Sequence, residues 1–74
     1  MNESILFYAF RYALGRKTYA VGIVAEELEK HADTLSPSTR ETIVQEIDEA
    51  ELSGSLGMPM DADVWRRVRE KLTT

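Results

Sequence analysis

Apolar residues recur at helical spacing through nearly all of this 74-residue chain, and clear breaks divide the pattern into four segments. The first segment runs from Glu3 to Leu14 and holds four of the six aromatic residues. Its apolar face covers more than half of the helix circumference and comprises Ile5, Leu6, Phe7, Ala9, Phe10, Ala13 and Leu14. Such a wide face is typical of a central helix that touches several neighbours. Gly15 follows and can take the left-handed conformation that ends a helix.

The second segment runs from Tyr19 to Asp33, and Thr18 is its expected N-cap. One stripe of this helix is apolar and comprises Val21, Val24, Ala25, Leu28, Ala32 and Leu35. Gly22 weakens the helix by about 1 kcal/mol relative to alanine. It either permits close contact with the first helix or marks a later helix start. The β-branched residues around Gly22 leave a strand as the alternative.

The third segment begins where Ser36 can act as an N-cap and Pro37 suits the first helical position. Ser38 with Glu41 is an alternative capping box. The expected buried stripe comprises Ile43, Val44, Ile47 and Ala50, and the helix is expected to end near Ser53 and Gly54.

The fourth segment follows a loop from Ser53 to Met60, and Asp61 is its expected N-cap. Met60 and Trp65 flank this cap with the spacing of a hydrophobic staple, and we expect Met58 and Met60 to fold back onto the core. The apolar stripe comprises Val64, Trp65, Val68 and Leu72. Two pairs have the i,i+4 spacing of helical ion pairs, Asp63–Arg67 and Arg66–Glu70.

These segments predict an all-α fold, a compact bundle of four short helices with the N-terminal helix central, in a single domain spanning residues 1–74. The chain has no cysteine, which excludes disulfides and thiolate metal sites and fits a reducing compartment. Its longest apolar run is about ten residues, well short of the ~20 needed to cross a bilayer, and it lacks the features of a signal peptide. We therefore expect a cytoplasmic protein without a membrane partner, and the apolar first helix makes a homodimer one open possibility.

The net charge of −4 is unevenly distributed along the chain. Residues 1–25 carry one acid and three bases, residues 26–51 nine acids and two bases, and residues 52–74 three acids and four bases. An acidic middle argues against a general polyanion binder, which needs a concentrated basic face. Segregated charge favours an interaction module that binds a protein partner. The expected contact residues are Arg11, Arg16, Lys17 and Tyr19 in one region, and Glu41, Glu46, Asp48 and Glu49 in an acidic one.

No set of residues has the composition of a catalytic or metal site. His31 is the only histidine, and both metal binding and nucleophilic catalysis need several converging groups. The acidic run between Glu46 and Glu51 lacks the glycine-centred pattern of a calcium loop. The Gly15–Thr18 stretch follows no strand and lacks the upstream glycine of a phosphate-binding loop, with Phe10 at that position. We therefore expect no catalytic residue, metal or cofactor.

A helix-turn-helix reader of DNA is the alternative interpretation of the second and third segments. The residues that would contact DNA are Ser36, Ser38, Thr39 and Arg40, at the start of the third helix. Arg40 is the only base on that helix and shares it with five acids, so phosphate groups would be repelled. DNA is therefore the less favoured partner.

The stretch from Phe10 to Tyr19, FRYALGRKTY, resembles a motif in short proteins encoded by phages and prophages of Gram-positive bacteria. The resemblance continues through the acidic third segment, the Gly57–Asp61 stretch and the Trp65–Val68 ending, and so spans most of the chain. It implies a phage or prophage accessory protein in the cytoplasm of the host cell. It implies no activity and transfers no catalytic residue.

Overall fold

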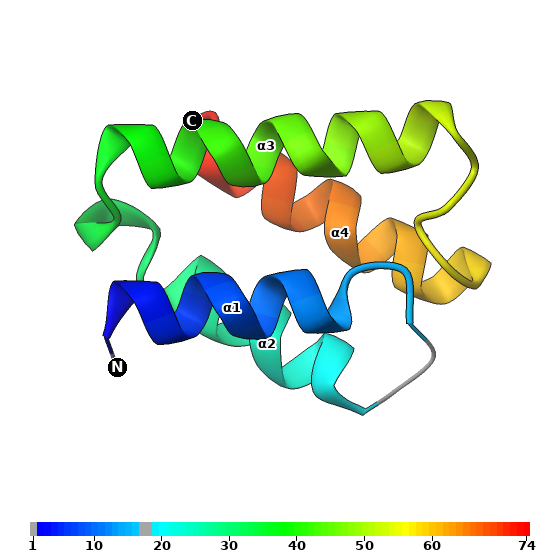
Figure 1. The fold of residues 1–74 in the computed structure, drawn as a ribbon, viewed down its shortest axis with the longest axis horizontal. Coiled ribbons are helices and arrows are strands. Elements are labelled where there is room, and N and C mark those ends of the chain that lie inside the picture. Colours follow the sequence, from blue (N-terminus) through cyan, green and yellow to red (C-terminus); the bar gives the residue numbers. More distant parts are fainter. Residues whose placement is uncertain (1, 17–18) are drawn as a thin grey trace.

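The structure is a computed structural model that describes residues 2–16 and 19–74, and most of these residues are helical (Figure 1). Within them the helices are α1 (Glu3–Ala13), α2 (Ala20–Lys30), the 3₁₀ helix η1 (Ala32–Thr34), α3 (Pro37–Leu52) and α4 (Pro59–Leu72). The predicted all-α bundle of four short α-helices is confirmed. The strand considered around Gly22 is absent, because that residue lies inside α2.

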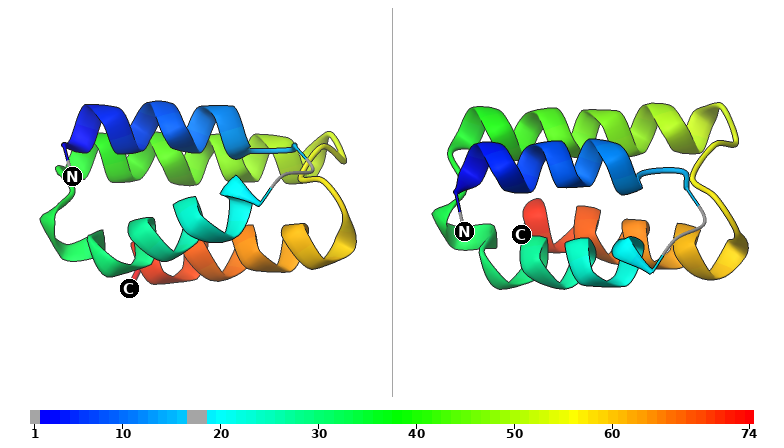
Figure 2. Two further views of the ribbon diagram at one scale, coloured as in Figure 1. Left: turned by 90° about the horizontal axis from the view of Figure 1, so that it is seen from below. Right: turned by 60° about the horizontal axis from the view of Figure 1, so that its bottom comes forward.

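The four α-helices pack in two layers, with α1 beside α3 in one layer and α2 beside α4 in the other (Figure 2). The two helices of each layer run parallel, and each helical hairpin, α1–α2 and α3–α4, runs antiparallel between the layers. The N-terminus, η1 and the C-terminus therefore share one end of the bundle (Figure 1). The loops that follow α1 and α3 meet at the other end.

The core is centred on Phe10 of α1 and Trp65 of α4, both fully buried. Their rings meet edge to face with centroids 5.4 Å apart, a favoured geometry for aromatic pairs. Aliphatic side chains from α2 and α3 surround them, including Leu28, Ile43 and Ile47. The Trp65 Nε1 is enclosed and has no acceptor in the described part of the chain, so packing alone holds the indole in place.

The wide apolar face of α1 is only partly covered. Leu6, Phe10 and Ala13 are buried, while Ile5, which the helical pattern places on the covered face, is exposed. The expectation is wrong for Ile5 because α1 packs in a corner between α2 and α3 and cannot be enclosed on all sides. The side of α1 that carries Ile5 therefore remains in solvent.

The α1 helix ends as the glycine predicts. Gly15 has a φ of +79°, in the left-handed region, and the Arg16 N–H donates to the Ala13 carbonyl at 3.0 Å. A side chain at Gly15 would also meet the Ser55 carbonyl oxygen, since a Cβ built there lies only 2.7 Å from it. The glycine thus lets the two loops at this end of the bundle approach closely.

The second helix begins at Ala20 and ends at Lys30, earlier than the predicted Asp33, because the chain tightens into η1. The predicted cap Thr18 lies outside the described residues, and the residue before the helix, Tyr19, makes no side-chain cap. Gly22 serves neither of its expected roles. It is exposed within the helix, and a Cβ built on it has no neighbour within 4 Å.

Glu3 ties α1 to the start of α3. Its Oε1 accepts the Ser36 backbone N–H at 2.7 Å, and its Oε2 lies 2.9 Å from the Ser36 Oγ and 2.8 Å from the Thr39 Oγ1. Ser36 is the N-cap of α3 and its Oγ accepts from the Thr39 N–H, which confirms the predicted cap; Ser38 lies inside the helix instead. These hydrogen bonds lower the pKa of Glu3. The bond from the Ser36 backbone has the largest effect, followed by those from the Thr39 and Ser36 side chains.

The start of α4 differs from the prediction. The helix begins at Pro59, so Asp61 lies inside the first turn and Met58 is the cap residue, without a side-chain cap bond. Proline at the first helical position accounts for the earlier start, since its fixed φ suits a helix and its missing N–H costs no bond there. Met58 and Met60 are exposed, so the predicted staple and the fold-back onto the core are both wrong.

Replacing Gly22 with alanine is expected to raise the free energy of unfolding by about 0.5–1 kcal/mol, since the site is helical and open. Urea unfolding followed by the fluorescence of Trp65, the single tryptophan, measures this change. Gly15→Ala is the matched control and is expected to destabilise the fold, because its φ is positive and the Ser55 carbonyl blocks a side chain. An unchanged or lower stability of Gly22→Ala would contradict the open, helical site.

The carboxylate of Glu3 is expected to make stability depend on acid pH. Because its pKa is lowered in the folded state, its contribution is complete above its ordinary pKa of about 4.3, and is lost as the pH falls through the lowered value. Glu3→Gln should therefore be less stable than the parent at neutral pH, and the difference should shrink towards pH 3. Urea unfolding of both proteins across this range measures it. A difference that stays constant with pH would contradict the ionised anchor.

Candidate functional site

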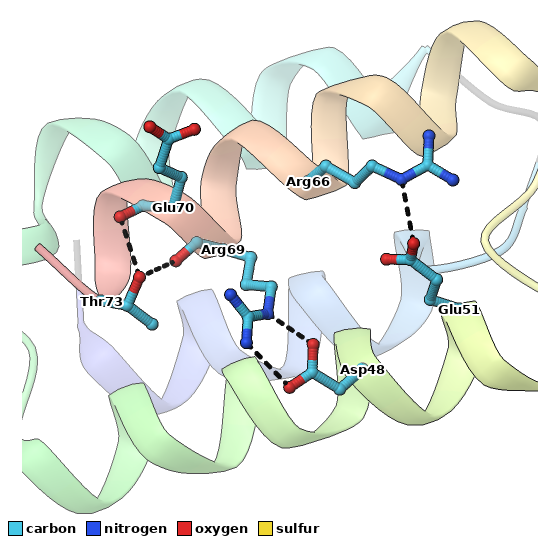
Figure 3. A network of polar contacts seen from close by, with 6 residues as sticks. All are labelled: Asp48, Glu51, Arg66, Arg69, Glu70 and Thr73. Carbon is cyan, nitrogen blue, oxygen red and sulfur yellow. Dashed lines mark hydrogen bonds and ion pairs between the residues drawn. The ribbon is translucent and has the colours of Figure 1, made fainter.

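Ion pairs join the acidic face of α3 to its neighbours. Asp48 is bound by Arg69 of α4 through two hydrogen bonds, one of them from Nη2 to Oδ2 at 3.3 Å, and Glu51 accepts from the Nε of Arg66 at 3.2 Å (Figure 3). These bonds raise the pKa of both arginines. On the opposite side of α3, Glu46 lies 3.2 Å from the Nη2 of Arg11 on α1. Glu46, Asp48 and Glu51 thus face the bases of the first and last helices.

The predicted acidic contact region is therefore divided. Glu46 and Asp48 are half-buried in ion pairs, while Glu41 and Glu49 are exposed and Glu49 accepts from Gln45 at 3.1 Å. Arg11, which was predicted to act in the basic region, neutralises Glu46 instead of lying beside Arg16. Arg11 of the predicted basic region thus pairs with Glu46 of the predicted acidic region. Because Arg69 also pairs with Asp48, the acidic region is not purely acidic in the folded protein.

The helical pairs predicted within α4 are replaced by others. Arg66 pairs with Asp63 at i,i+3 spacing as well as with Glu51, and Arg67 lies 3.4 Å from Glu29 of α2. The arginines of α4 thus form ion pairs with both neighbouring helices, α2 and α3. A pattern within one helix could not reveal this, because the partners lie 15 to 38 residues away along the chain.

The residues of the DNA-reader interpretation have partners inside the fold. Ser36 and Thr39 bind Glu3, and the Nη2 of the half-buried Arg40 donates to the Ala32 carbonyl. Ser38 is the one of the four that is exposed. No observation therefore favours base contacts from this helix start, and DNA binding stays a prediction.

A groove of about 470 Å³ lies at the end of the bundle that carries the C-terminus. Its wall is largely apolar, and its lining residues are Asp33, Leu35, Pro37, Arg40, Glu41, Val44, Leu72 and Thr73. Asp33 and Glu41 both line it, and their carboxylates have no partner within the described residues. The Nη2 of Arg40, which also lines the groove, donates to the Ala32 carbonyl.

The most distinctive exposed feature is apolar and lies on α1 and α2. Ile5, Tyr8 and Tyr12 are 59%, 70% and 57% exposed, and their spacing of three and four residues places them on one side of α1. Ile23 of α2 is 65% exposed, and Tyr19, just before α2, is 94% exposed. We call these five residues, together with Arg16, the α1–α2 surface.

Ile23 lies on the outer side of α2. The buried residues of that helix are Val21, Val24, Ala25 and Leu28, and the helical repeat places Ile23 roughly opposite them. We group Ile23 with the exposed side chains of α1 because α1 and α2 form one helical hairpin.

Arg16 contacts one of the tyrosines of the α1–α2 surface. Its guanidinium carbon lies 4.9 Å from the centroid of the Tyr12 ring, within the range of a cation–π contact. This contact holds one charge at the end of the apolar strip formed by Ile5, Tyr8 and Tyr12. Lys17, the remaining residue of the predicted basic region, lies outside the described residues.

Comparisons of this chain with protein-family models, curated proteins and solved structures found no match. The assignment of a site therefore depends on the geometry alone. None of the described helices combines the length and hydropathy that crossing a bilayer requires. Within residues 2–16 and 19–74, no three histidine or acidic side chains converge in a way that could hold a metal ion.

Sequence reasoning identified part of the α1–α2 surface. Arg16 and Tyr19 were expected to contact a partner, whereas Ile5, Tyr8, Tyr12 and Ile23 were not among the expected contact residues. The available signal was the spacing of Ile5, Tyr8 and Tyr12, which defines a second strip on α1 beside the one that is buried.

The ion pair of Asp48 with Arg69 is expected to show energetic coupling. Asp48→Asn and Arg69→Gln should each lower the midpoint of thermal unfolding, and the double variant should lose little more than the worse single variant. The coupling should shrink at ~1 M salt, where charges on the surface are screened. Losses that add fully at low salt would show that the two side chains do not act as a pair.

Proposed function

We propose that this protein is a non-catalytic interaction module that binds a protein partner through the α1–α2 surface. The proposal rests on the exposure of Ile5, Tyr8 and Tyr12 on one side of α1. The Arg16 guanidinium lies over the ring of Tyr12 at the end of this strip. Tyrosine and arginine are enriched where protein interfaces bury most of their binding energy. Contiguous apolar surface on a small folded chain is the usual mark of an association site.

The charge arrangement supports the same choice of surface. Glu46, Asp48 and Glu51 of α3 are matched by Arg11, Arg69 and Arg66, so a partner would have to break intramolecular ion pairs to use these three acids. The side chains of the α1–α2 surface take part in no ion pair with another helix among the described residues, and Ile5, Tyr8 and Tyr12 remain more than half exposed. We therefore move the proposed contact from the charged regions to this surface, and keep Arg16 and Tyr19 from the predicted set.

The biological setting that we propose follows from the sequence resemblance. It is that of a phage or prophage accessory protein that acts in the host cytoplasm and meets a host or phage protein there. The support is the likeness of the FRYALGRKTY stretch and of the later segments to short prophage-encoded proteins.

The proposal is tested by affinity capture with the purified chain as bait. Tyr8→Ala/Tyr12→Ala is expected to reduce the recovery of its partner roughly tenfold or more, since residues of this type contribute most of an interface's energy. Both side chains are exposed, so thermal unfolding should be nearly unchanged. Bound proteins are quantified by mass spectrometry from a lysate of a Gram-positive host.

Two matched variants serve as controls. Leu52→Ser removes a still more exposed apolar side chain from the C-terminal end of α3, and Glu41→Lys/Glu49→Lys reverses the two acids that remain exposed. Both are expected to keep the partner. Recovery that is lost on reversing the acids but kept without the tyrosines would instead support recognition by charge and contradict the proposed surface.

A further inference from the structure

We propose that the partner that covers the α1–α2 surface is a second copy of this chain, with the two α1 helices packed antiparallel about a twofold axis. The inference rests on the proposed function, because it uses the same surface and names its occupant. Three observations carry it: the size of the surface, the placement of its tyrosines and the charges at its two ends.

The exposed area is close to half of a small dimer interface. Taking a tyrosine side chain as about 200 Å² and an isoleucine side chain as about 150 Å², the exposed fractions of the three tyrosines and two isoleucines amount to roughly 600 Å² per copy. Stable interfaces of the standard class bury ~600–1,000 Å² on each partner. The surface of one copy therefore lies at the lower end of what a twofold dimer needs from each side.

The tyrosines suit a twofold arrangement. Tyr8 and Tyr12 are four residues apart on one side of α1, so a twofold axis that passes between them would place Tyr8 of each copy against Tyr12 of the other. Ile5 of each copy would then lie near the end of α1 in the other copy. A single type of contact is thereby used twice, which is the defining property of an isologous interface.

The charges at the ends of the surface complement each other under the same symmetry. Arg16 follows the C-terminal end of α1, whereas Glu27 lies near the other end of the surface, because α2 runs antiparallel to α1. The side chain of Glu27 is 28% exposed and lies 3.3 Å from the Nε2 of His31. Antiparallel α1 helices bring Arg16 of each copy towards Glu27 of the other, whereas parallel helices would bring the two arginines together.

The experiment measures the mass of the purified full chain by sedimentation equilibrium, from about 1 to 100 µM, which spans dissociation constants in the micromolar range. The expected mass is twice that of the 8.4 kDa chain. Tyr8→Ala/Tyr12→Ala is expected to weaken the dimer roughly tenfold or more, while Leu52→Ser should remain dimeric. Circular dichroism of each variant establishes that the fold is kept.

A charge exchange tests the antiparallel arrangement. Arg16→Glu is expected to weaken the dimer by opposing Glu27 with a like charge, and adding Glu27→Arg to the same chain should restore it. Salt should reduce both effects. Failure of the second change to restore association would overturn the antiparallel pairing.

The remaining outcomes separate this inference from the proposed function. A chain that stays monomeric at the highest concentration, yet captures another protein in a tyrosine-dependent manner, would overturn the dimer and leave the interaction module standing. A dimer that is indifferent to Tyr8 and Tyr12, or that is lost in Leu52→Ser, would place the interface elsewhere and overturn the inference. Loss of tyrosine dependence in both assays would overturn the two proposals together.

Discussion

The edge-to-face contact of Phe10 with Trp65 determines how four short helices share one small core. It joins α1 to α4, which lie in different layers and at opposite corners of the bundle, and both side chains are fully buried. A chain of this length encloses little volume, and two large aromatic rings occupy much of its centre. Of the other aromatic side chains of α1, Phe7 packs against the edge of the core, and Tyr8 and Tyr12 lie on the surface.

The same close packing brings oppositely charged helices together. Along the chain, acids dominate the middle and bases the two ends, but in space α3 lies between α1 and α4. Arg11, Arg66 and Arg69 therefore meet Glu46, Glu51 and Asp48 across the helix contacts. The uneven charge along the sequence thus serves the packing of the helices, because the oppositely charged groups pair at the edges of the core.

Outside the core, the α1–α2 surface carries apolar side chains that the bundle leaves more than half exposed. Arg16 supplies one charge at the end of this surface, where its guanidinium lies over the Tyr12 ring. Ile23 adds an exposed apolar side chain from α2. This arrangement links core packing to association: a bundle too small to enclose both sides of α1 gains further burial only from another polypeptide. The proposed function and the proposed dimer both follow from that geometry.

The sequence by itself determined the helices and several of their ends, because these depend on neighbours within one or two turns. The Ser36 cap, Pro37 at the start of α3, the left-handed Gly15 and the buried stripes of α3 and α4 are all of this kind. Where two local signals competed, as with Pro59 and Asp61 at the start of α4, the sequence pattern did not decide between them. Only the tertiary structure decided which side of α1 is covered and which charges pair. Ile5 and Leu6 are equally apolar, so the sequence alone does not show which of them is buried. In the same way, the Arg11 side chain could pair with an acid of a partner protein or, as observed, with Glu46. Their different environments arise because burial and ion pairing depend on helices that are distant in the chain and adjacent only in space.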